Sequence, residues 1–312
     1  MEIRQIQYFV AVFEQGSMTK AAQRLNVVQP ALSQQISKLE DEFGRQLFQR
    51  TPKGMVATRA GEEAYGYFSS ILRDLDAARR NIMNDSGVVS GSVAIGVVSS
   101  VANNALGETL LSFSKKFPEV TIRATGGYTN ELMEMLRDSQ LDVVVVNVPP
   151  RASKRNMIDI VTEDLALIGS AKNRKVFRGP PSLEALQGID LVLPSRRHGL
   201  RLIIDRAAAA QQVTLSPQIE IDEIKTIEDF VSSTDFFTIL PPIAVHRLLA
   251  QGQLRAHPIV PRIPRRLVYV TNPNHPLSTA AQLLVDEIRE KMIDVLYELG
   301  LNLEGDGDAP SR

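Results

Sequence analysis

The chain has 312 residues, a length that fits two or three domains. Its 35 basic and 36 acidic side chains nearly balance, so a charged partner would have to be recognised locally. The absence of cysteine excludes a disulfide framework, a thiolate zinc site and a thiol redox sensor. No apolar run is long enough to span a bilayer, and no signal peptide is recognisable. We therefore expect a cytoplasmic protein without membrane association, in which residues 304–312 form a disordered tail.

The start of the chain predicts three successive helices. In the first, apolar residues recur at helical spacing, at Ile3, Ile6, Phe9, Val10 and Phe13. Ser17 is a suitable N-cap for a second helix, and residues 26–28 interrupt the pattern. Pro30 then stands where the first turn of a third helix tolerates proline, because the missing N–H has no intrahelical partner there. The three helices can share one small core.

The third helix has two chemically different faces. Its apolar face consists of Ala31, Leu32, Ile36, Leu39 and Phe43, and its polar face carries Ser33, Gln34, Gln35 and Lys38. Amides, a hydroxyl and a lysine can read base edges and phosphates in a DNA major groove. An ordinary amphipathic helix with a solvated face is the alternative.

The following segment, residues 47–58, favours the DNA-binding interpretation. Pro52 and Gly54 predict a hairpin turn. Two basic residues, Arg50 and Lys53, stand at its tip. Three helices followed by a basic hairpin predict a winged helix-turn-helix. Residues 1–60 hold eight basic and five acidic side chains, so one copy should bind DNA weakly and a dimer more tightly.

A longer helix should follow the hairpin, with Thr58 as its N-cap. Apolar residues then recur at alternating spacings of four and three, at Ala64, Phe68, Ile71, Leu75, Ala78 and Ile82. Such a heptad seam is typical of a contact between two helices. We expect it to pair two copies of the chain; packing against the chain's own next domain is the alternative. Residues 86–92, rich in serine and glycine, should form a flexible break.

Beyond this break strands and helices alternate. Strands are predicted at 92–98, 120–124, 141–147, 166–169, 190–193, 219–221, 236–239 and 267–271. Helices are predicted at 106–117, 131–138, 200–211, 224–231, 243–250 and 280–299. Four valines at 143–146 are typical of a parallel strand covered on both faces. Two units of similar size predict two lobes, and ligands of such sheets bind at the carboxyl ends of strands, against helix N-termini.

Several polar residues occupy such positions. Ser99 and Ser100 end the first of these strands, and Thr129 precedes a predicted helix; each could hold an anion or simply cap its helix. Three further polar residues follow the strand that ends at residue 193, namely Ser195, Arg196 and His198. Arginine can bind a carboxylate bidentately, but a solvated loop charge is equally expected. Arg197 and Arg201 should lie at the surface.

Residues 1 to about 65 resemble the DNA-binding domain of LysR-type transcriptional regulators. The resemblance rests on the run SMTKAAQRLNVVQPALSQQISKLEDEFGRQLFQR, residues 17–50. It continues more weakly through GSVAIGVVSSVANN, VTIRATGGYTNELMEMLRDSQLDVVVV and FFTILPPIAV. The later segments resemble most the subgroup around nitrogen-assimilation control regulators. Gln34 stands where many members have arginine.

The resemblance implies an α+β winged helix-turn-helix domain, a dimerising linker helix and a two-lobed α/β effector domain resembling type 2 periplasmic binding proteins. The expected boundaries are 1–58, 59–90 and 91–303, with 91–163 and 267–303 in lobe I and 164–266 in lobe II. Strands should cross between the lobes near 161–165 and 265–269.

The resemblance also implies functional residues and partners. DNA would be contacted by Ser17, Thr19, Gln29, Pro30, Ser33, Gln34, Lys38, Arg50 and Lys53. A small, anionic effector would be bound by Ser99, Ser100, Val101, Thr129, Asn147, Ser195, Arg196 and His198. The expected partners are double-stranded operator DNA with inverted-repeat half-sites, the effector, RNA polymerase and further copies of the chain in a homodimer or homotetramer. No cofactor, metal or catalytic residue is expected.

One departure concerns the effector cleft. Thr234 and Phe236 stand where the family commonly has two glycines. Because glycine permits positive φ and close backbone approach, either the turn is rebuilt or the cleft is narrower. An effector-independent regulator is therefore an alternative.

Other classes of protein fit less well. An enzyme would need a catalytic motif, but the chain has no GxSxG elbow, phosphate-binding GxxxxGK[ST] or dinucleotide fingerprint, and its four histidines lack metal-ligand spacing. A solute-binding protein would explain two lobes but not the N-terminal motif. An architectural DNA-binding protein is a further alternative to a sequence-specific regulator.

Overall fold

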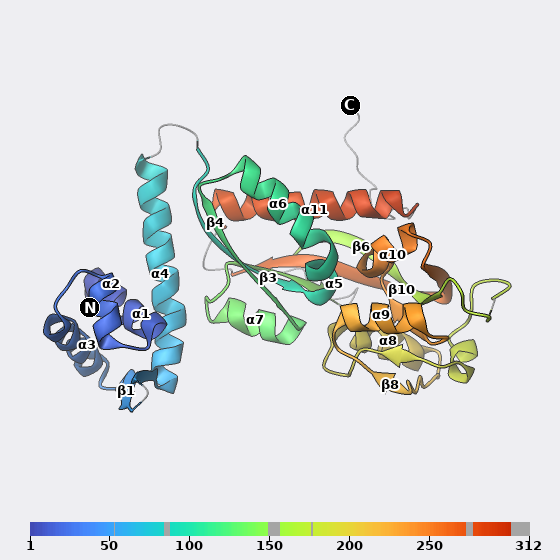
Figure 1. The fold of residues 1–312 in the computed structure, drawn as a ribbon, viewed down its shortest axis with the longest axis horizontal. Helices are drawn as coiled ribbons and strands as arrows, with labels where there is room; N and C mark the ends of the chain where they lie inside the picture. The colour runs from blue at the N-terminus through green and yellow to red at the C-terminus, as the bar shows by residue number, and fades with distance from the viewer. Residues whose placement is uncertain (53, 84–87, 149–156, 176, 273–276, 301–312) are drawn as a thin grey trace.

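A computed structural model describes residues 1–52, 54–83, 88–148, 157–175, 177–272 and 277–300. A small helical domain at the N-terminus is joined by one long helix, α4 (Arg59–Met83), to a larger α/β body (Figure 1). The tail predicted at 304–312 lies outside the described residues, as do residues 86 and 87 of the predicted break.

The N-terminal domain contains three helices and a hairpin. Its elements are α1 (Ile3–Gln15), α2 (Met18–Arg24), α3 (Gln29–Phe43), β1 (Phe48–Thr51) and β2 (Gly54–Ala57). Ser17 caps α2 by accepting a hydrogen bond from the Lys20 amide. Asn26 adopts a left-handed conformation with φ of 53° between α2 and α3. This bend brings the two helices together as a helix-turn-helix.

The core of this domain forms around Phe9, whose ring centroid lies 4.9 Å from that of Phe48 and 5.2 Å from that of Phe68. Leu32, Ile36 and Leu39 of α3 are buried against it, as predicted. Three other residues expected on the apolar faces, Ile3, Ala31 and Phe43, are instead exposed.

The α/β body is built on one six-stranded sheet in the order β4-β3-β5-β10-β6-β9. The strands are β3 (Gly91–Val98), β4 (Val120–Gly127), β5 (Val143–Val148), β6 (Met157–Ser170), β9 (Phe237–Leu240) and β10 (Leu254–Thr271). β3 pairs in parallel with β4 and β5, whereas β10 pairs antiparallel with β5 and β6. β5 is buried along its length, as the valine run predicted, but only one of its two neighbours is parallel.

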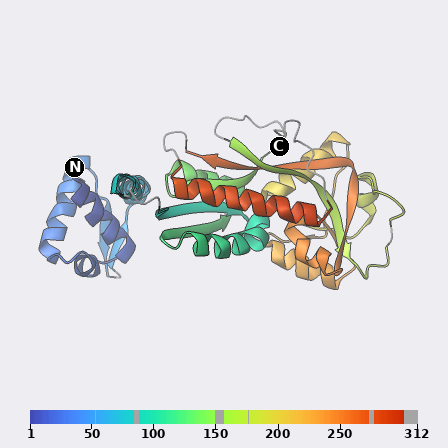
Figure 2. The ribbon, with the colours of Figure 1, turned by 90° about the horizontal axis from the view of Figure 1, so that it is seen from above.

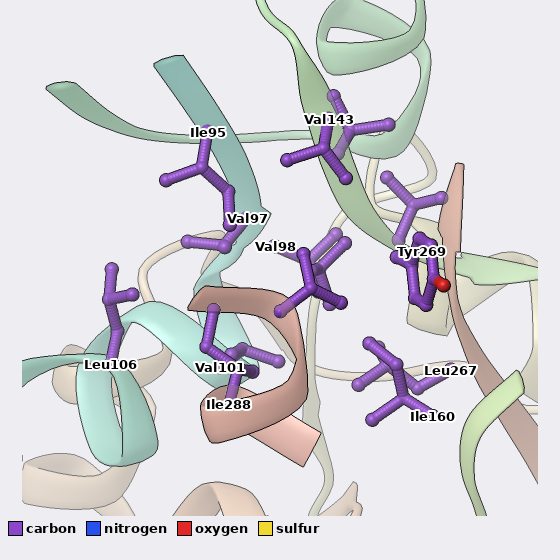
Figure 3. Close-up of a cluster of buried hydrophobic side chains, with 14 of the residues drawn as sticks. Ile95, Val97, Val98, Val101, Leu106, Val143, Ile160, Leu267, Tyr269 and Ile288 are labelled. Carbon is purple, nitrogen blue, oxygen red and sulfur yellow. The ribbon is translucent and has the colours of Figure 1, made fainter. Parts of the chain in front are cut away.

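Helices cover both faces of the first lobe. α6 (Gly107–Lys116) and α11 (Thr279–Glu298) lie on one face and α7 (Thr129–Arg137) on the other (Figure 1). Figure 2 shows α11 running along the body. α5 (Ser99–Val101) and a π-helical turn, η1 (Ala102–Leu106), connect β3 to α6. Side chains from β3, β5, β10 and α11 meet in the core between these layers (Figure 3).

The second lobe is smaller. It contains η2 (Glu184–Gly188), β7 (Val192–Leu193), α8 (Gly199–Ala210), β8 (Ile219–Glu220), α9 (Ile224–Ser233), η3 (Pro242–Val245) and α10 (His246–Ala250). β7 pairs in parallel with β8. The predicted helix 243–250 is thus divided into a 3₁₀ turn and a short α-helix.

Two hydrophobic cores lie on either side of the strands that connect the lobes. The first includes Val161 and Leu267, and the second includes Leu165 and Ile263. Ile243 belongs to the first core although it follows β9 in the second lobe. β6 and β10 run through both lobes and are much longer than the predicted strands at 166–169 and 267–271.

Candidate DNA-binding surface and effector site

The N-terminal half of α3 presents most of the residues predicted to contact DNA. Gln29, Pro30 and Gln34 are exposed, Ser33 is half-buried, and Lys38 extends the exposed side toward the C-terminus. Gln35, placed on the same polar face from the sequence, instead accepts a hydrogen bond from Gln5 of α1 at 3.3 Å. Because Gln35 is directed toward the domain itself, the candidate DNA-contacting face of α3 contains fewer polar side chains than predicted.

Other predicted contacts flank α3. Thr19 at the start of α2 is exposed, and Ser17 is half-buried by its capping role. Arg50 is exposed on β1, while Lys53 lies outside the described residues. The Glu40 carboxylate accepts hydrogen bonds from the Leu47 and Phe48 amides at 2.8 and 3.1 Å, which fixes the hairpin to the end of α3.

The predicted linker seam divides into two parts. Phe68 is only 4% exposed because it packs in the N-terminal core, together with half-buried Ala64. Phe68 is therefore not available to a partner helix, which corrects its predicted place in the seam. Ile71 is 39% exposed, Leu75 is half-buried and Ala78 is exposed. The Ile82 side chain lies outside the described residues.

Arg265 occupies the centre of the region predicted to bind an effector. Its guanidinium is fully buried. Nε and Nη2 donate to Glu163 Oε1 at 3.1 and 2.7 Å, and Nη1 donates to Ser100 Oγ at 2.8 Å and Asn147 Oδ1 at 3.0 Å. The predicted site residues Ser100 and Asn147 are thus brought together by an arginine of the chain itself.

The N-terminus of α8 faces this cluster from the second lobe. Thr129 Oγ1 and Asn147 Nδ2 are buried without a hydrogen-bond partner in the described part of the chain. A Cβ atom added to Gly199 would lie 3.1 Å from Thr129 Oγ1 and 3.8 Å from Asn147 Nδ2. The two unsatisfied polar atoms therefore converge on the first residue of a helix, where backbone N–H groups favour an anion.

His198 caps α8 and is 3% exposed. Its Nδ1 accepts a hydrogen bond from the Leu200 amide at 3.2 Å, so the ring is neutral. Burial lowers the pKa of His198, and the nearby charge of Arg265 lowers it further, although Asp222 opposes both. The His198 ring packs edge-on against Tyr128 of the first lobe, with 5.7 Å between ring centroids.

More polar contacts connect the lobes beside this ring pair. Arg197 lies over the Tyr128 ring at 5.6 Å and pairs with Glu131 at 3.6 Å. Burial raises the pKa of Tyr128, and hydrogen bonding to the Asp222 carboxylate raises it further. Asp222 also accepts from the Ser195 amide at 3.0 Å. These contacts hold the N-terminal end of α7 against the second lobe.

The remaining predicted effector residues are less central. Val101 is buried in the first core and Ser99 is half-buried. Ser195 is half-buried, and Arg196 is exposed rather than directed into the cluster. Arg201, predicted to be at the surface, is instead buried between Asp205 at 2.8 Å and Glu220 at 2.7 Å.

The turn before β9 contains both departures from the family pattern. Thr234 is extended, with φ of −133°, and its hydroxyl donates to the Phe230 carbonyl and accepts from the Phe236 amide. The Phe236 ring packs on Phe230 of α9, 5.1 Å between centroids, among the second core. Phe236 is therefore accommodated by packing within the second lobe.

Sequence reasoning missed Glu163 and Arg265, the two charged residues at the middle of the site. Both stand in stretches that were expected to cross between lobes, but a charge in a strand usually faces solvent. The available signal was the apolar residues two positions before and after each charge, which share its face of the strand and indicate a face too deeply buried for an unpaired ion. Among the described residues, no three histidine, aspartate or glutamate side chains gather as a metal ion would require.

A winged helix-turn-helix joined through a long helix to a two-lobed α/β domain defines a DNA-binding regulator with a separate ligand-binding domain. Comparison with known families agrees. The family model of the LysR substrate binding domain matches residues 86–293. The family model of the bacterial regulatory helix-turn-helix proteins of the lysR family matches residues 3–62. The chain therefore belongs to the LysR family of transcriptional regulators, which confirms the family and fold predicted from the sequence.

Individual relatives support the same assignment. The nitrogen assimilation regulatory protein nac of Escherichia coli is 32% identical over 80% of this chain and 81% of its own. The regulator CzcR of Bacillus subtilis is 30% identical over 83% of this chain and 86% of its own.

Solved structures share the fold. A full-length OxyR variant from Pseudomonas aeruginosa has a TM-score of 0.71 at 21% identity, covering 93% of this chain and 95% of that one. Full-length CbnR in complex with its target DNA has a TM-score of 0.62 at 22% identity, covering 93% of this chain and 100% of that one. No helix in the described ranges is long and apolar enough to cross a membrane.

Proposed function

We propose that this LysR-family regulator reads inverted-repeat operator DNA with two copies of α3 and the β1–β2 hairpin. We further propose that a small carboxylate or similar anion controls it by binding between the lobes. The chain would work in the cytoplasm, contact RNA polymerase and have no catalytic activity, as suits a family of transcriptional regulators.

The observation that carries the effector proposal is the pair of unsatisfied polar atoms at the start of α8. Leaving buried polar groups unpaired costs about 1–3 kcal/mol each, so a native site of this kind calls for a partner. Asn147 Nδ2 is a donor, the Thr129 hydroxyl can donate, and the Gly199 N–H at the start of α8 is a further donor, whereas the Leu200, Arg201 and Leu202 amides already donate to His198. Such a set of donors suits an anionic oxygen. Arg265, and not the exposed Arg196 predicted from the sequence, is the cation close to these donors.

A second candidate is an effector-independent regulator. It is favoured by the hydrogen bonds that Ser100 Oγ and Asn147 Oδ1 already accept from Arg265. In that case the lobes would stay closed on their own polar contacts, and DNA binding would not respond to small molecules.

Thermal melts of the full chain distinguish the two candidates. Formate, acetate and succinate are titrated against wild type and Thr129→Val, which keeps the side-chain shape and removes the hydroxyl. We expect at least one anion to stabilise wild type more than the variant. Thr121→Val, on exposed β4, is the control and should respond as wild type does. Equal responses of all three proteins would favour the effector-independent candidate.

A further inference from the structure

Glu163 and Arg265 face each other at the place where the two lobes join. They are paired residues of the antiparallel ladder between β6 and β10. On one side of the pair, Val161 and Leu267 belong to the first core; on the other, Leu165 and Ile263 belong to the second. The ion pair therefore lies between the two hydrophobic cores, where a movement of one lobe relative to the other would change its surroundings.

The pair is nearly sealed from solvent. The side chain of Arg265 is 0% exposed and that of Glu163 is 3% exposed. Of the groups that accept hydrogen bonds from Arg265 in the described chain, Glu163 alone carries a charge; Ser100 and Asn147 are neutral. A buried arginine is tolerated only when its charge is matched, and Glu163 provides that match.

The same arginine is close to the proposed anion site. Asn147 accepts from Arg265 through Oδ1 and directs its unpaired Nδ2 toward the start of α8. An anion held there would come within the field of the guanidinium. It would also come within the field of the Glu163 carboxylate, which repels it.

We infer that Glu163 is an internal carboxylate that competes with the ligand's anionic group for Arg265, and that it thereby determines which ligands the proposed effector site accepts. This inference rests on the proposed effector site. A monocarboxylate must either displace Glu163 from Arg265 or bind through neutral donors alone, so its affinity is low. Removing the charge of Glu163 would leave the Arg265 guanidinium as an uncompensated cation beside the proposed effector site.

The test compares acetate and succinate binding to the full chain by calorimetry at constant ionic strength. Glu163→Gln keeps the length of the side chain and one acceptor for Arg265. We expect it to tighten binding of at least one of these anions by about tenfold or more, because it removes the repulsion between two like charges in a region sealed from solvent. Glu228→Gln, another buried glutamate in α9, is the matched control and should leave the affinity unchanged.

Two further variants make the outcome decisive. The double variant Glu163→Gln/Arg265→Gln has no uncompensated charge at this pair, so it should not show the tighter anion binding expected of Glu163→Gln. If Glu163→Gln does not fold, Glu163→Asp retains the charge but withdraws it from Arg265, and a smaller gain is expected. Binding no tighter than wild type in a folded Glu163 variant would overturn the inference.

The results also separate this inference from the proposed site. A gain in Glu163→Gln that persists unchanged when Thr129→Val is added would support competition for Arg265 while contradicting the α8 site. Weakening by Thr129→Val without a gain in Glu163→Gln would support the site and refute the competition.

Discussion

Gln34 is the exposed amide best placed on α3 to read a base. An amide can bond bidentately to adenine, so replacing it should affect specificity more than general affinity. We predict that Gln34→Ala loses about 1–3 kcal/mol on an operator selected from random DNA and little on unrelated DNA. Fluorescence anisotropy on both DNAs measures this. Gln35→Ala is the control, because Gln35 is turned toward α1. An equal loss on both DNAs would rule out base readout by Gln34.

His198 should make the stability of the chain depend on pH. Burial holds its pKa below the ordinary value of 6.5, so the unfolded chain takes up a proton first on acidification. The stabilisation that His198 contributes to the folded chain is therefore fully present above about pH 6.5, and it decreases as the pH falls below that value.

His198→Asn isolates this contribution, since asparagine also caps helices but does not titrate. The melting temperature of wild type minus that of His198→Asn should decrease as the pH is lowered from 7.5 to 5.5. Taking this difference removes the contributions of Glu163 and Glu228, whose pKa values burial raises and which act in the opposite direction. A difference independent of pH would contradict a buried, neutral His198.

The linker helix offers the clearest test of assembly. With Phe68 committed to the N-terminal core, the seam that remains for a partner contains Ile71, Leu75 and Ala78. A charge at Leu75 would have to be desolvated in an apolar contact. We predict that Leu75→Asp weakens dimerisation roughly 30-fold or more by sedimentation, whereas exposed Asp76→Asn does not. An unchanged oligomer would show that copies associate elsewhere.

The elements differ in how far the sequence could predict them. α3 and the hairpin follow from local backbone preferences, since Pro30 and Pro52 have a fixed φ and Gly54 permits a positive one. The full length of β10 could not be predicted, because its three prolines argue against a strand. In the structure a register shift lies within this proline-containing segment.

The candidate effector site shows the same limit. Thr129 and Asn147 could be placed by pattern and resemblance, since each ends or begins a regular element. Glu163 and Arg265 could not be paired, because 102 residues separate them and only the assembled ladder brings them together. Arg201 was misplaced for a similar reason, since it lies in helix α8 and its partner Glu220 comes from strand β8.

α7 connects the candidate effector site to the linker helix. Its first residue, Thr129, approaches Gly199, and the carbonyl oxygen of Asp138 beyond its last turn is so close to Gly66 of α4 that a Cβ there would collide with it. Movement of α7 would therefore displace α4, which carries the DNA-binding domain (Figure 1).

Gly66→Ala tests this connection. We predict that it preserves binding to a single half-site but changes the preferred spacing between two half-sites, measured by selection from DNA with variable spacers. Gly107→Ala is the control, since a Cβ there meets nothing within 4 Å. If both variants select the wild-type spacing, the contact between α4 and α7 does not position the DNA-binding domains.

The most direct test of control by a ligand between the lobes is a footprint of the full chain on its selected operator, with and without acetate or succinate at matched ionic strength. We predict that one of these anions alters the protected region for wild type and that Thr129→Val abolishes the change while still binding the operator. A footprint that is the same for wild type at every anion concentration, under conditions where calorimetry shows the anion bound, would contradict that control.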